Sequence, residues 1–377
     1  MGSLREDQTI IGGERLMGGL RAAGYVAVNV KIRAMKAKLL TLADYDRIIQ
    51  AGSLMEGVRI IIGLVRPSKI AEELSHLLVS GEEVSLTVID NALTRSFVAI
   101  HNQLAEMCPK DTRKFLELYY LKKYDIENLK TIIKTIHQGI PPEKIQELLF
   151  PPISGDFEEL TELMALESMD QLKDALRDEL AKKAINEAFE AYKEIDSSLI
   201  LELALDRELY TQLWEMIPSL SRGDRAWAIH LLGMQIDLRN ILAILRGVQL
   251  GLDSATLNRF LIPVNYKLKE NLERAIVTTT MLDALRFLAV GPYEEIVERI
   301  RMIIEDNRSL ADAEHLVEEY FTREDGRVFY GYPFHIGTVL GFLNLLKIEL
   351  RNIKASLVGN VEGVSADKIR ESLIFIR

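Results

Sequence analysis

Apolar residues recur at helical spacing along most of the chain. The clearest run steps by four and three residues in turn, through Trp227, Leu231, Met234, Leu238, Ile241 and Leu245. This spacing places all of these side chains on one face of a helix. No segment shows a sustained alternation of apolar and polar residues bounded by turn residues, which is the pattern of a half-buried strand. The sequence therefore predicts an all-α fold without a sheet.

The same apolar face recurs when 112 is added to or subtracted from each of these residue numbers. The later face is apolar throughout, and consists of Val339, Leu343, Leu346, Leu350, Ile353 and Leu357. The earlier face has one break, at Lys122, among Phe115, Tyr119, Ile126, Leu129 and Ile133. A constant offset of this kind indicates an internal repeat.

Polar residues and glycines follow the same offset. An acid is followed three residues later by asparagine, in the pairs Asp125 and Asn128, Asp237 and Asn240, and Glu349 and Asn352. A glycine follows each acid at one constant distance, at Gly139, Gly251 and Gly363. Arginine precedes the asparagine in two of the three places, as Arg239 and Arg351, whereas the first has Glu127. We interpret these coincidences as three repeats with a period of 112.

The repeats divide the chain when residues are counted back from the C-terminus. The division predicts an N-terminal extension at residues 1–41 and helical repeats at residues 42–153, 154–265 and 266–377. Pro151 and Pro263 lie at matching positions near two boundaries. Each repeat is predicted to hold several short helices, a hairpin of two longer helices, a glycine stop and a short closing helix. We expect Gly251 and its equivalents to end their helices in the left-handed conformation.

Composition and charge narrow the class of protein. Hydrophobic residues make up 48% and charged residues 27% of the chain, which is typical of a folded globular protein. The net charge of −10 argues against a general nucleic-acid binder. Cys108 is the one cysteine, so an intrachain disulfide is excluded and a reducing, cytosolic setting is indicated. The apolar runs are shorter than the roughly 20 residues that cross a bilayer, so we expect no direct membrane span.

Motifs that carry chemistry are absent or incomplete. The sequence has no phosphate-binding glycine loop and no nucleophile elbow. Glu73 and His76 form half of a di-iron helix motif, but no second half follows. Cys108 precedes Pro109 and is interpreted as a buried or turn residue. We therefore predict no catalytic, cofactor-binding or metal-binding residues, and no cofactor.

Two groups of polar residues have alternative interpretations. The acid and asparagine pairs lie on one helical face, and could contact another protein or form an internal hydrogen bond that fixes how helices meet. A basic amphipathic stretch runs from Asn29 to Leu40. It could touch anionic lipid or an acidic protein, or be a solvated helix face. The predicted contacts with other molecules are Lys31, Arg33, Lys38, Arg95 and Arg207.

Several of these segments together resemble a known family. The stretch from Tyr25 to Leu40, with its core of Val-Asn-Val-Lys-Ile-Arg-Ala-Met-Lys-Ala-Lys-Leu-Leu, resembles the N-terminal signature of the C subunit of archaeal and bacterial A/V-type ATPases, called the d subunit in eukaryotic V-ATPases. Internal signatures of that family resemble the segments 204–210, 237–241 and 349–353. The resemblance covers roughly residues 25 to 377. Glu127 departs from the arginine of the other repeats, so no surface role for that arginine carries over to the first repeat.

The resemblance implies an architecture and a role. It implies three similar helical domains with pseudo-threefold symmetry, forming a cup or funnel. It implies a non-catalytic central-stalk subunit that links the rotor axle to the membrane proteolipid ring and transmits torque for proton or sodium transport. The subunit would lie on the cytoplasmic face of the membrane as a peripheral part of the complex. Two other classes stay open, a generic helical scaffold or adaptor and a helical enzyme with an unrecognised site.

Overall fold

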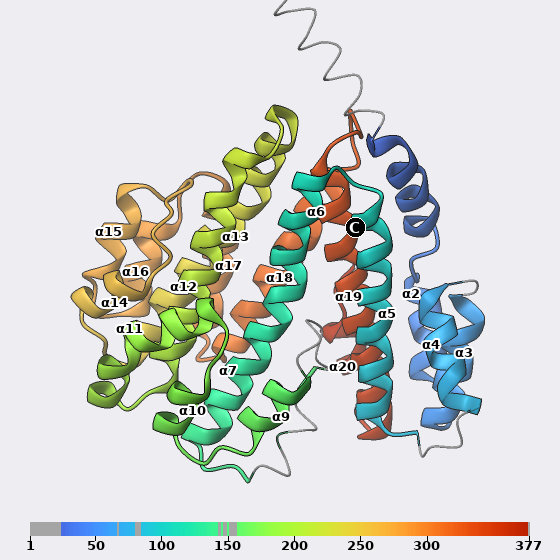
Figure 1. Ribbon diagram of the computed structural model, residues 1–377, viewed down its shortest axis with the longest axis horizontal. Coiled ribbons are helices and arrows are strands. Elements are labelled where there is room, and N and C mark those ends of the chain that lie inside the picture. The colour runs from blue at the N-terminus through green and yellow to red at the C-terminus, as the bar shows by residue number, and fades with distance from the viewer. Residues whose placement is uncertain are drawn as a thin grey trace, which may run out of the picture. The chain divides into compact units, whose positions relative to one another are not determined.

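The computed structural model describes residues 24–65, 68–79, 84–141, 145, 149–150 and 157–375. Within these ranges all regular structure is helical and no strand occurs (Figure 1). The predicted all-α class is therefore confirmed. Most of the predicted N-terminal extension, at residues 1–23, lies outside the described residues, as does Pro151 at a predicted boundary.

Contacts between residues divide the chain into two compact units. The first compact unit contains the described parts of Met1–Glu117 together with Leu220–Trp227 and Thr322–Arg377, and the second contains Leu118–Ser219 and Ala228–Phe321. Each compact unit therefore draws on segments that are distant in sequence.

The first compact unit is built around one long C-terminal helix, α19 (Ile336–Val361). It packs against α2 (Leu42–Ile49), α3 (Leu54–Leu64), α5 (Leu86–Glu106) and α20 (Ala366–Ser372). Figure 1 shows α19 in red beside α5 in blue-green. A helix at residues 24–36, α4 (Lys69–Val79) and α6 (Lys110–Leu116) complete this unit. The apolar face of α19 fills the core, because Val339, Leu343 and Ile353 are fully buried.

The second compact unit contains paired helices. Its closest pairs are α11 (Glu179–Ile195) with α12 (Ser198–Met216), α7 (Lys123–His137) with α12, and α15 (Glu270–Ile276) with α16 (Met281–Leu288). The unit also holds α9 (Phe157–Met164), α10 (Met169–Ala175), α14 (Ser254–Phe260) and α17 (Glu294–Glu305). The helices α13 (Arg222–Gln249) and α18 (Leu310–Arg327) belong to it for most of their length. Asp178 caps α11 and Asp253 caps α14 through their side chains.

Helix ends recur at the offset found in the sequence. The helices α5, α12 and α18 begin at residues 86, 198 and 310, each 112 after the one before. The helices α7, α13 and α19 end at residues 137, 249 and 361. Both ends of α14 and α20 are related in the same way. Local structure therefore follows the 112-residue spacing, while the division into three domains remains a prediction.

The predicted apolar faces are buried with one exception. On α13, Leu231, Met234, Leu238, Ile241 and Leu245 are all buried, whereas Trp227 is half-buried. In the first repeat the break at Lys122 coincides with a π-helical turn, Glu117–Lys122. The ammonium group of Lys122 forms an ion pair with Asp178. A polar residue on this face is thus accommodated by a local change in helix geometry and a charged partner.

Among the described residues, α13 has the length and composition of a possible membrane span. In the most apolar stretch of this helix, however, 78% of the residues are buried within the protein. That burial is typical of the core helix of a folded protein rather than of a lipid-facing one.

Candidate functional site

The asparagine of each acid and asparagine pair forms the same pair of hydrogen bonds. Its amide nitrogen donates to the main-chain oxygen of the residue 22 positions later, and its side-chain oxygen accepts from the N–H of that residue. The pairs are Asn128 with Phe150, Asn240 with Ile262, and Asn352 with Ile374. All three asparagines are buried. Of the two interpretations of these asparagines, the internal hydrogen bond is therefore the one the structure supports.

The repeated glycines end their helices as predicted. Gly139, Gly251 and Gly363 have φ angles of +63°, +71° and +68°. After each glycine, the next N–H bonds a carbonyl five residues back, as Leu252 does to Gly247 at 2.9 Å. This is the Schellman arrangement, which satisfies carbonyls at a helix end. The left-handed conformation predicted for Gly251 is confirmed.

A second glycine position lets the closing helix approach the long helix. In the third repeat, a β-carbon on Gly359 would lie 2.6 Å from Ile369 of α20. In the second repeat, a β-carbon on Gly247 would lie closer still to Leu257 of α14. Contacts this short leave no room for a side chain. We did not predict this position from the sequence, although the two glycines and their two apolar partners are related by the repeat offset.

Two of the three acids, Asp237 and Glu349, accept hydrogen bonds from residues at or next to the predicted beginning of another repeat. Asp237 accepts from the N–H groups of Tyr266 and Lys267 at 3.2 and 2.6 Å, where the predicted third repeat begins. It also accepts from the hydroxyl of Tyr293 at 2.9 Å. Glu349 accepts from the N–H of Leu40 at 2.7 Å, next to the start of the predicted first repeat. Burial raises the pKa of Glu349 to about 7 and also raises that of Asp237.

Arg239 and Glu127, which occupy equivalent positions in two repeats, belong to one charged cluster in the second compact unit. Glu127 lies 3.2 Å from Lys130, and Lys130 lies 2.6 Å from Asp206. Arg239 lies 3.2 Å from the other oxygen of Asp206 and stacks over the Tyr210 ring at 4.7 Å. We name these five residues the charged cluster. We did not predict this meeting from the sequence, where Glu127 appeared only as a departure from the arginine of the other two repeats.

Charge balance in the cluster decides its protonation states. Burial disfavours ionisation of Glu127, but the charges of Lys130 and Arg239 outweigh it and lower the pKa of this carboxyl group below its ordinary value. Burial, helped by the charge of Arg239, lowers the pKa of the neighbouring Lys123 to about 8. The cluster therefore holds ionised groups that neutralise one another, as a structural ion network does. Arg351 in the third repeat instead donates to the main-chain oxygen of Ser372 at 3.4 Å.

Three equivalent positions of the repeats converge in the first compact unit. The hydroxyl of Tyr25 lies 2.7 Å from that of Thr112 and is also a hydrogen-bond partner of Asp224. Asp224, which is the repeat equivalent of Thr112, accepts a 2.7 Å hydrogen bond from the N–H of Ile336, the next equivalent position. Asp224 thereby caps the beginning of α19. Sequence reasoning did not find this meeting point, because Thr, Asp and Ile share no chemistry.

The residues predicted to contact other molecules are partly paired within the chain. Arg33 donates to the side-chain oxygen of Asn29 at 3.1 Å, Arg95 donates to Glu73 at 2.9 Å, and Arg207 lies 3.8 Å from Glu187. These pairs are at least partly exposed, and such pairs contribute little to stability. Lys31 and Lys38 lie together beside a pocket in the first compact unit. The role of all five in contacts with other molecules stays a prediction.

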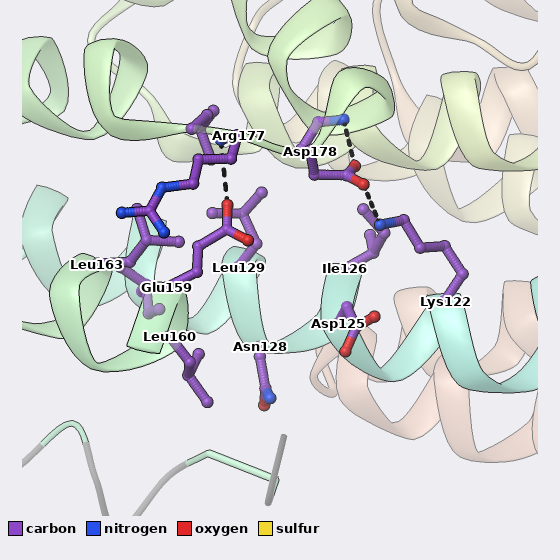
Figure 2. Close-up of a pocket in the computed structure, with 13 residues that line it drawn as sticks. Lys122, Asp125, Ile126, Asn128, Leu129, Glu159, Leu160, Leu163, Arg177 and Asp178 are labelled. Atoms are coloured by element: carbon purple, nitrogen blue, oxygen red, sulfur yellow. Dashed lines mark hydrogen bonds and ion pairs between the residues drawn. The ribbon is translucent and has the colours of Figure 1, made fainter. Parts of the chain in front are cut away.

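A further pocket, of about 390 Å³, lies in the second compact unit (Figure 2). It is lined by Asp125 and Asn128 of the first repeat and by apolar residues of α9 and α11. The N–H of Arg177 donates to Glu159 at 3.1 Å across it, and Lys122 pairs with Asp178. Two pairs of its polar groups thus satisfy one another.

Cys108 and Glu73, which belong to the chemical motifs considered in the sequence, lie among the residues that the structure describes. Burial raises the pKa of the Cys108 thiol to about 12, which suppresses the reactive thiolate. The thiol donates to the oxygen of Leu104 at 3.2 Å, so its interpretation as a buried residue is confirmed. Glu73 of the incomplete di-iron motif is paired with Arg95. In the part of the chain that the structure describes, no three histidine, cysteine or acidic residues are placed to hold a metal ion.

Comparisons with known proteins identify the family. Three similar proteins are the C subunits of A-type ATP synthases. The one from Methanocaldococcus jannaschii is 24% identical over 93% of this chain and 86% of its own length. Those from Pyrococcus horikoshii and Halobacterium salinarum are each 24% identical, over 92% and 94% of this chain and 89% and 98% of their own lengths. The family described as ATP synthase (C/AC39) subunit matches residues 28–372. The chain therefore belongs to the ATP synthase (C/AC39) subunit family and is a subunit of an A/V-type ATP synthase.

Proposed function

We propose that this subunit is the central-stalk piece that links the rotor axle to the membrane proteolipid ring and transmits torque between them. The chain is a structural subunit and not a catalytic one, as its family membership indicates. The observation that carries the proposal is the repeated, internally bonded joint at Asn128, Asn240 and Asn352. A part that transmits torque needs stiffness and grip rather than chemistry, and such joints supply stiffness.

The stiffness argument rests on buried polar bonds. Each asparagine ties the segment after a closing helix to the long helix through two hydrogen bonds, in a buried setting where unmade bonds are costly. The left-handed glycine caps then fix the direction in which each closing helix leaves. Repetition of these features supports the proposal of three domains, at residues 42–153, 154–265 and 266–377, arranged with pseudo-threefold symmetry as a cup or funnel.

Grip requires surfaces that complement the neighbouring subunits. The net charge of −10 favours contact with basic parts of the rotor axle. The basic residues Lys31, Arg33, Lys38, Arg95 and Arg207 are proposed as contacts with the ring or the axle. The subunit belongs to a membrane-associated complex, and we place it on the cytoplasmic face without a span of its own.

Removal of the subunit tests the role. ATP hydrolysis and ion pumping are measured for the assembled complex, for the complex stripped of this subunit, and after the purified chain is added back. We expect stripping to abolish pumping while hydrolysis by the soluble head persists, and re-addition to restore pumping. Pumping that survives removal, or ATP hydrolysis by the isolated chain, would show that the coupling role is wrong.

A further inference from the structure

The loop between α18 and α19 carries aromatic side chains that are exposed to solvent. Tyr330 is 81% and Tyr332 is 63% exposed. On the helix at residues 24–36, Val30 is 66% exposed and Val26 is also exposed. All four residues belong to the first compact unit. We name these four residues the tyrosine surface.

A hydrogen bond joins the two segments that carry the tyrosine surface. The side-chain amide of Asn29 donates to the main-chain oxygen of Pro333 at 2.5 Å. Asn29 precedes Val30 and Pro333 follows Tyr332, so this bond places the helix and the loop side by side (Figure 1). An exposed apolar side chain on its own is ordinary, but several that adjoin are typical of a site of interaction.

Contacts on both sides of the two tyrosines hold the loop in place. His335 is buried, and its ring stacks on the ring of Trp227 with 4.5 Å between the ring centres. The ammonium group of Lys36 lies over the ring of Phe329 at 4.9 Å. A loop that is fixed before binding loses less conformational entropy when it binds, so its exposed rings are suited to anchor another protein.

Positive charge lies beside the tyrosine surface. Arg33 donates to the side-chain oxygen of Asn29, the residue that bonds the loop, at 3.1 Å. Lys36 lies on the same helix and over Phe329. The chain as a whole has a net charge of −10, so the cations that flank the tyrosine surface are opposite in sign to the overall charge.

We propose that the tyrosine surface docks on the cytoplasmic face of the membrane proteolipid ring, an inference that rests on the coupling role proposed above. The helices of such a ring end at the boundary between lipid and water. Tyrosine suits that boundary, because its ring can be buried against apolar groups while its hydroxyl stays hydrated. The flanking cations suit the anionic headgroups that surround the ring there.

The rotor axle is the other neighbour in the proposed role, and its chemistry fits the tyrosine surface less well. The axle belongs to the soluble head, so it has no lipid boundary for the tyrosines to match. The net negative charge of the chain, rather than the cations beside the tyrosine surface, complements basic parts of the axle. The proteolipid ring is therefore the partner that the tyrosine surface favours.

Binding of the full chain to the purified proteolipid ring in nonionic detergent tests the docking. The double variant Tyr330→Ser with Tyr332→Ser removes the exposed rings without changing the charge. We expect its dissociation constant for the ring to rise at least about tenfold, because aromatic side chains anchor interfaces, while its binding to the purified axle stays unchanged. Ring binding equal to that of the unmodified chain, or a loss confined to axle binding, would overturn the proposal.

A charge placed on the helix side of the tyrosine surface gives a second test. Val30→Glu should weaken ring binding at least about tenfold, because it puts a carboxylate among apolar groups in the interface. Val277→Glu is the matched control, since Val277 is equally exposed, at 66%, but lies in the second compact unit. Equal weakening by the two variants would show a diffuse effect of charge and contradict the site.

Vesicles distinguish the proteolipid ring from the lipid around it. One set is made of phosphatidylglycerol without the ring, and the other of phosphatidylcholine with the ring inserted. We expect the full chain to bind the vesicles that contain the ring more tightly, and the double tyrosine variant to lose this binding. Equally tight binding to the phosphatidylglycerol vesicles that also depends on the two tyrosines would make the surface a lipid site and overturn the proposal.

Ion pumping separates this inference from the coupling role. The unmodified chain should restore pumping to the stripped complex, whereas the double tyrosine variant should not. If both restore it fully, the tyrosine surface is not the ring contact, although the coupling role stands. If the unmodified chain fails to restore pumping, the coupling role is wrong, and ring binding by the variants then decides by itself whether the tyrosine surface docks there.

Discussion

At the scale of single residues, the three buried asparagines have the same structural role in different surroundings. Each closes two hydrogen bonds with one main-chain position 22 residues later. An amide suits this task because it offers a donor and an acceptor side by side, which matches the N–H and oxygen of one residue. Aspartate could accept but not donate, and alanine could do neither.

Asn240→Ala is therefore expected to be costly. It leaves the buried N–H and oxygen of Ile262 without partners, and should lower the free energy of unfolding by about 2–4 kcal/mol. Urea unfolding followed by circular dichroism measures the change. The control is Asn265→Ala, since Asn265 forms a similar pair of bonds with Lys269 but is exposed to water. A comparable loss in both variants would contradict the role of burial.

A substitution at Gly251 would strain the backbone without a steric clash, so its effect on stability measures the strain alone. A β-carbon there would meet no atom within 4 Å, while φ is +71°. Gly251→Val should consequently lower the free energy of unfolding by about 1–2 kcal/mol through conformation alone. Gly251→Asn should cost less, because asparagine tolerates the left-handed region. Equal stability of the valine variant and the unmodified chain in denaturant would exclude a strained cap.

Two buried carboxyl groups, Asp325 and Glu349, are expected to make the free energy of unfolding depend on pH. Burial raises the pKa of Asp325 to about 8, even though Asn344 donates to it at 3.0 Å. The neighbouring charge of Glu324 raises it further and that of Lys347 lowers it. Because this pKa is above the unfolded value of about 3.9, the folded state binds more protons and stability falls as pH rises toward 8. Glu349 contributes in the same direction up to about pH 7.

The test compares the free energy of unfolding at pH 7 and pH 8.5. Burial lowers the pKa of His101 and His335, and these groups act in the opposite direction only below about pH 6.5. We expect a loss of about 1 kcal/mol over this range, bounded by the limit of about 1.4 kcal/mol per pH unit for one proton. Asp325→Asn should flatten the dependence. If the slope is unchanged in that variant, another group is responsible.

At the scale of elements, the charged cluster joins α7, α12 and α13. Arg239 forms an ion pair with Asp206 on α12 and offsets the negative charge of Glu127 on α7. These interactions connect helices of two repeats. Its side chain is 28% exposed, so solvent screens part of the interaction. Mutual neutralisation of the cluster is what makes burial of these charges tolerable.

Arg239→Gln should destabilise the protein by about 1–3 kcal/mol, less than a fully buried pair would cost. The double variant Arg239→Gln with Glu127→Gln should recover part of the loss, because it removes the excess negative charge. Thermal and urea unfolding of the two single variants and the double variant give the interaction free energy between Arg239 and Glu127. Arg301→Gln is the control, since Arg301 forms two ion pairs with its own exposed helix neighbours. A double variant that is simply additive would contradict the coupling.

At the scale of the whole chain, the repeats in sequence and the compact units in space are different divisions. The predicted first repeat, residues 42–153, contributes α2 to α5 to the first compact unit, but α19 from the C-terminal end completes that core. Long-range bonds support this, such as those from Asn360 to the oxygens of Ile49 and Ala51 at 2.9 and 2.7 Å. Arg370 likewise pairs with Asp46 at 2.7 Å.

An isolated fragment of residues 42–153 should consequently fail to unfold cooperatively. Without α19, the apolar faces of α2, α3 and α5 are exposed to water. The loss of this buried apolar surface costs more free energy than the small net stability of a domain of this size. Calorimetry and circular dichroism of the fragment and of the full chain provide the comparison. A sharp two-state transition in the fragment would show that each repeat is an independent folding unit.

The sequence by itself determined the helical class, the 112-residue spacing and the glycine caps of this protein. These are local properties: helical periodicity needs only neighbours three and four residues apart, and a left-handed glycine needs only its own backbone. The resemblance to the family followed from the stretch between Tyr25 and Leu40 together with the repeated internal segments. The break at Lys122 in the apolar face was likewise evident from the order of the residues alone.

Only the tertiary structure decided which residues the repeats bring together. Nothing local in Glu349 predicts that it holds the N–H of Leu40, nor that Thr112, Asp224 and Ile336 converge. In the sequence, Lys31 and Lys38 lie on a basic amphipathic stretch that fits either a contact with another molecule or a solvated helix face, and only the fold places them beside a pocket that residues of α5 and α19 also line. Such contacts join residues up to about three hundred positions apart. Their formation depends on the packing of whole helices, which no window of neighbouring residues contains.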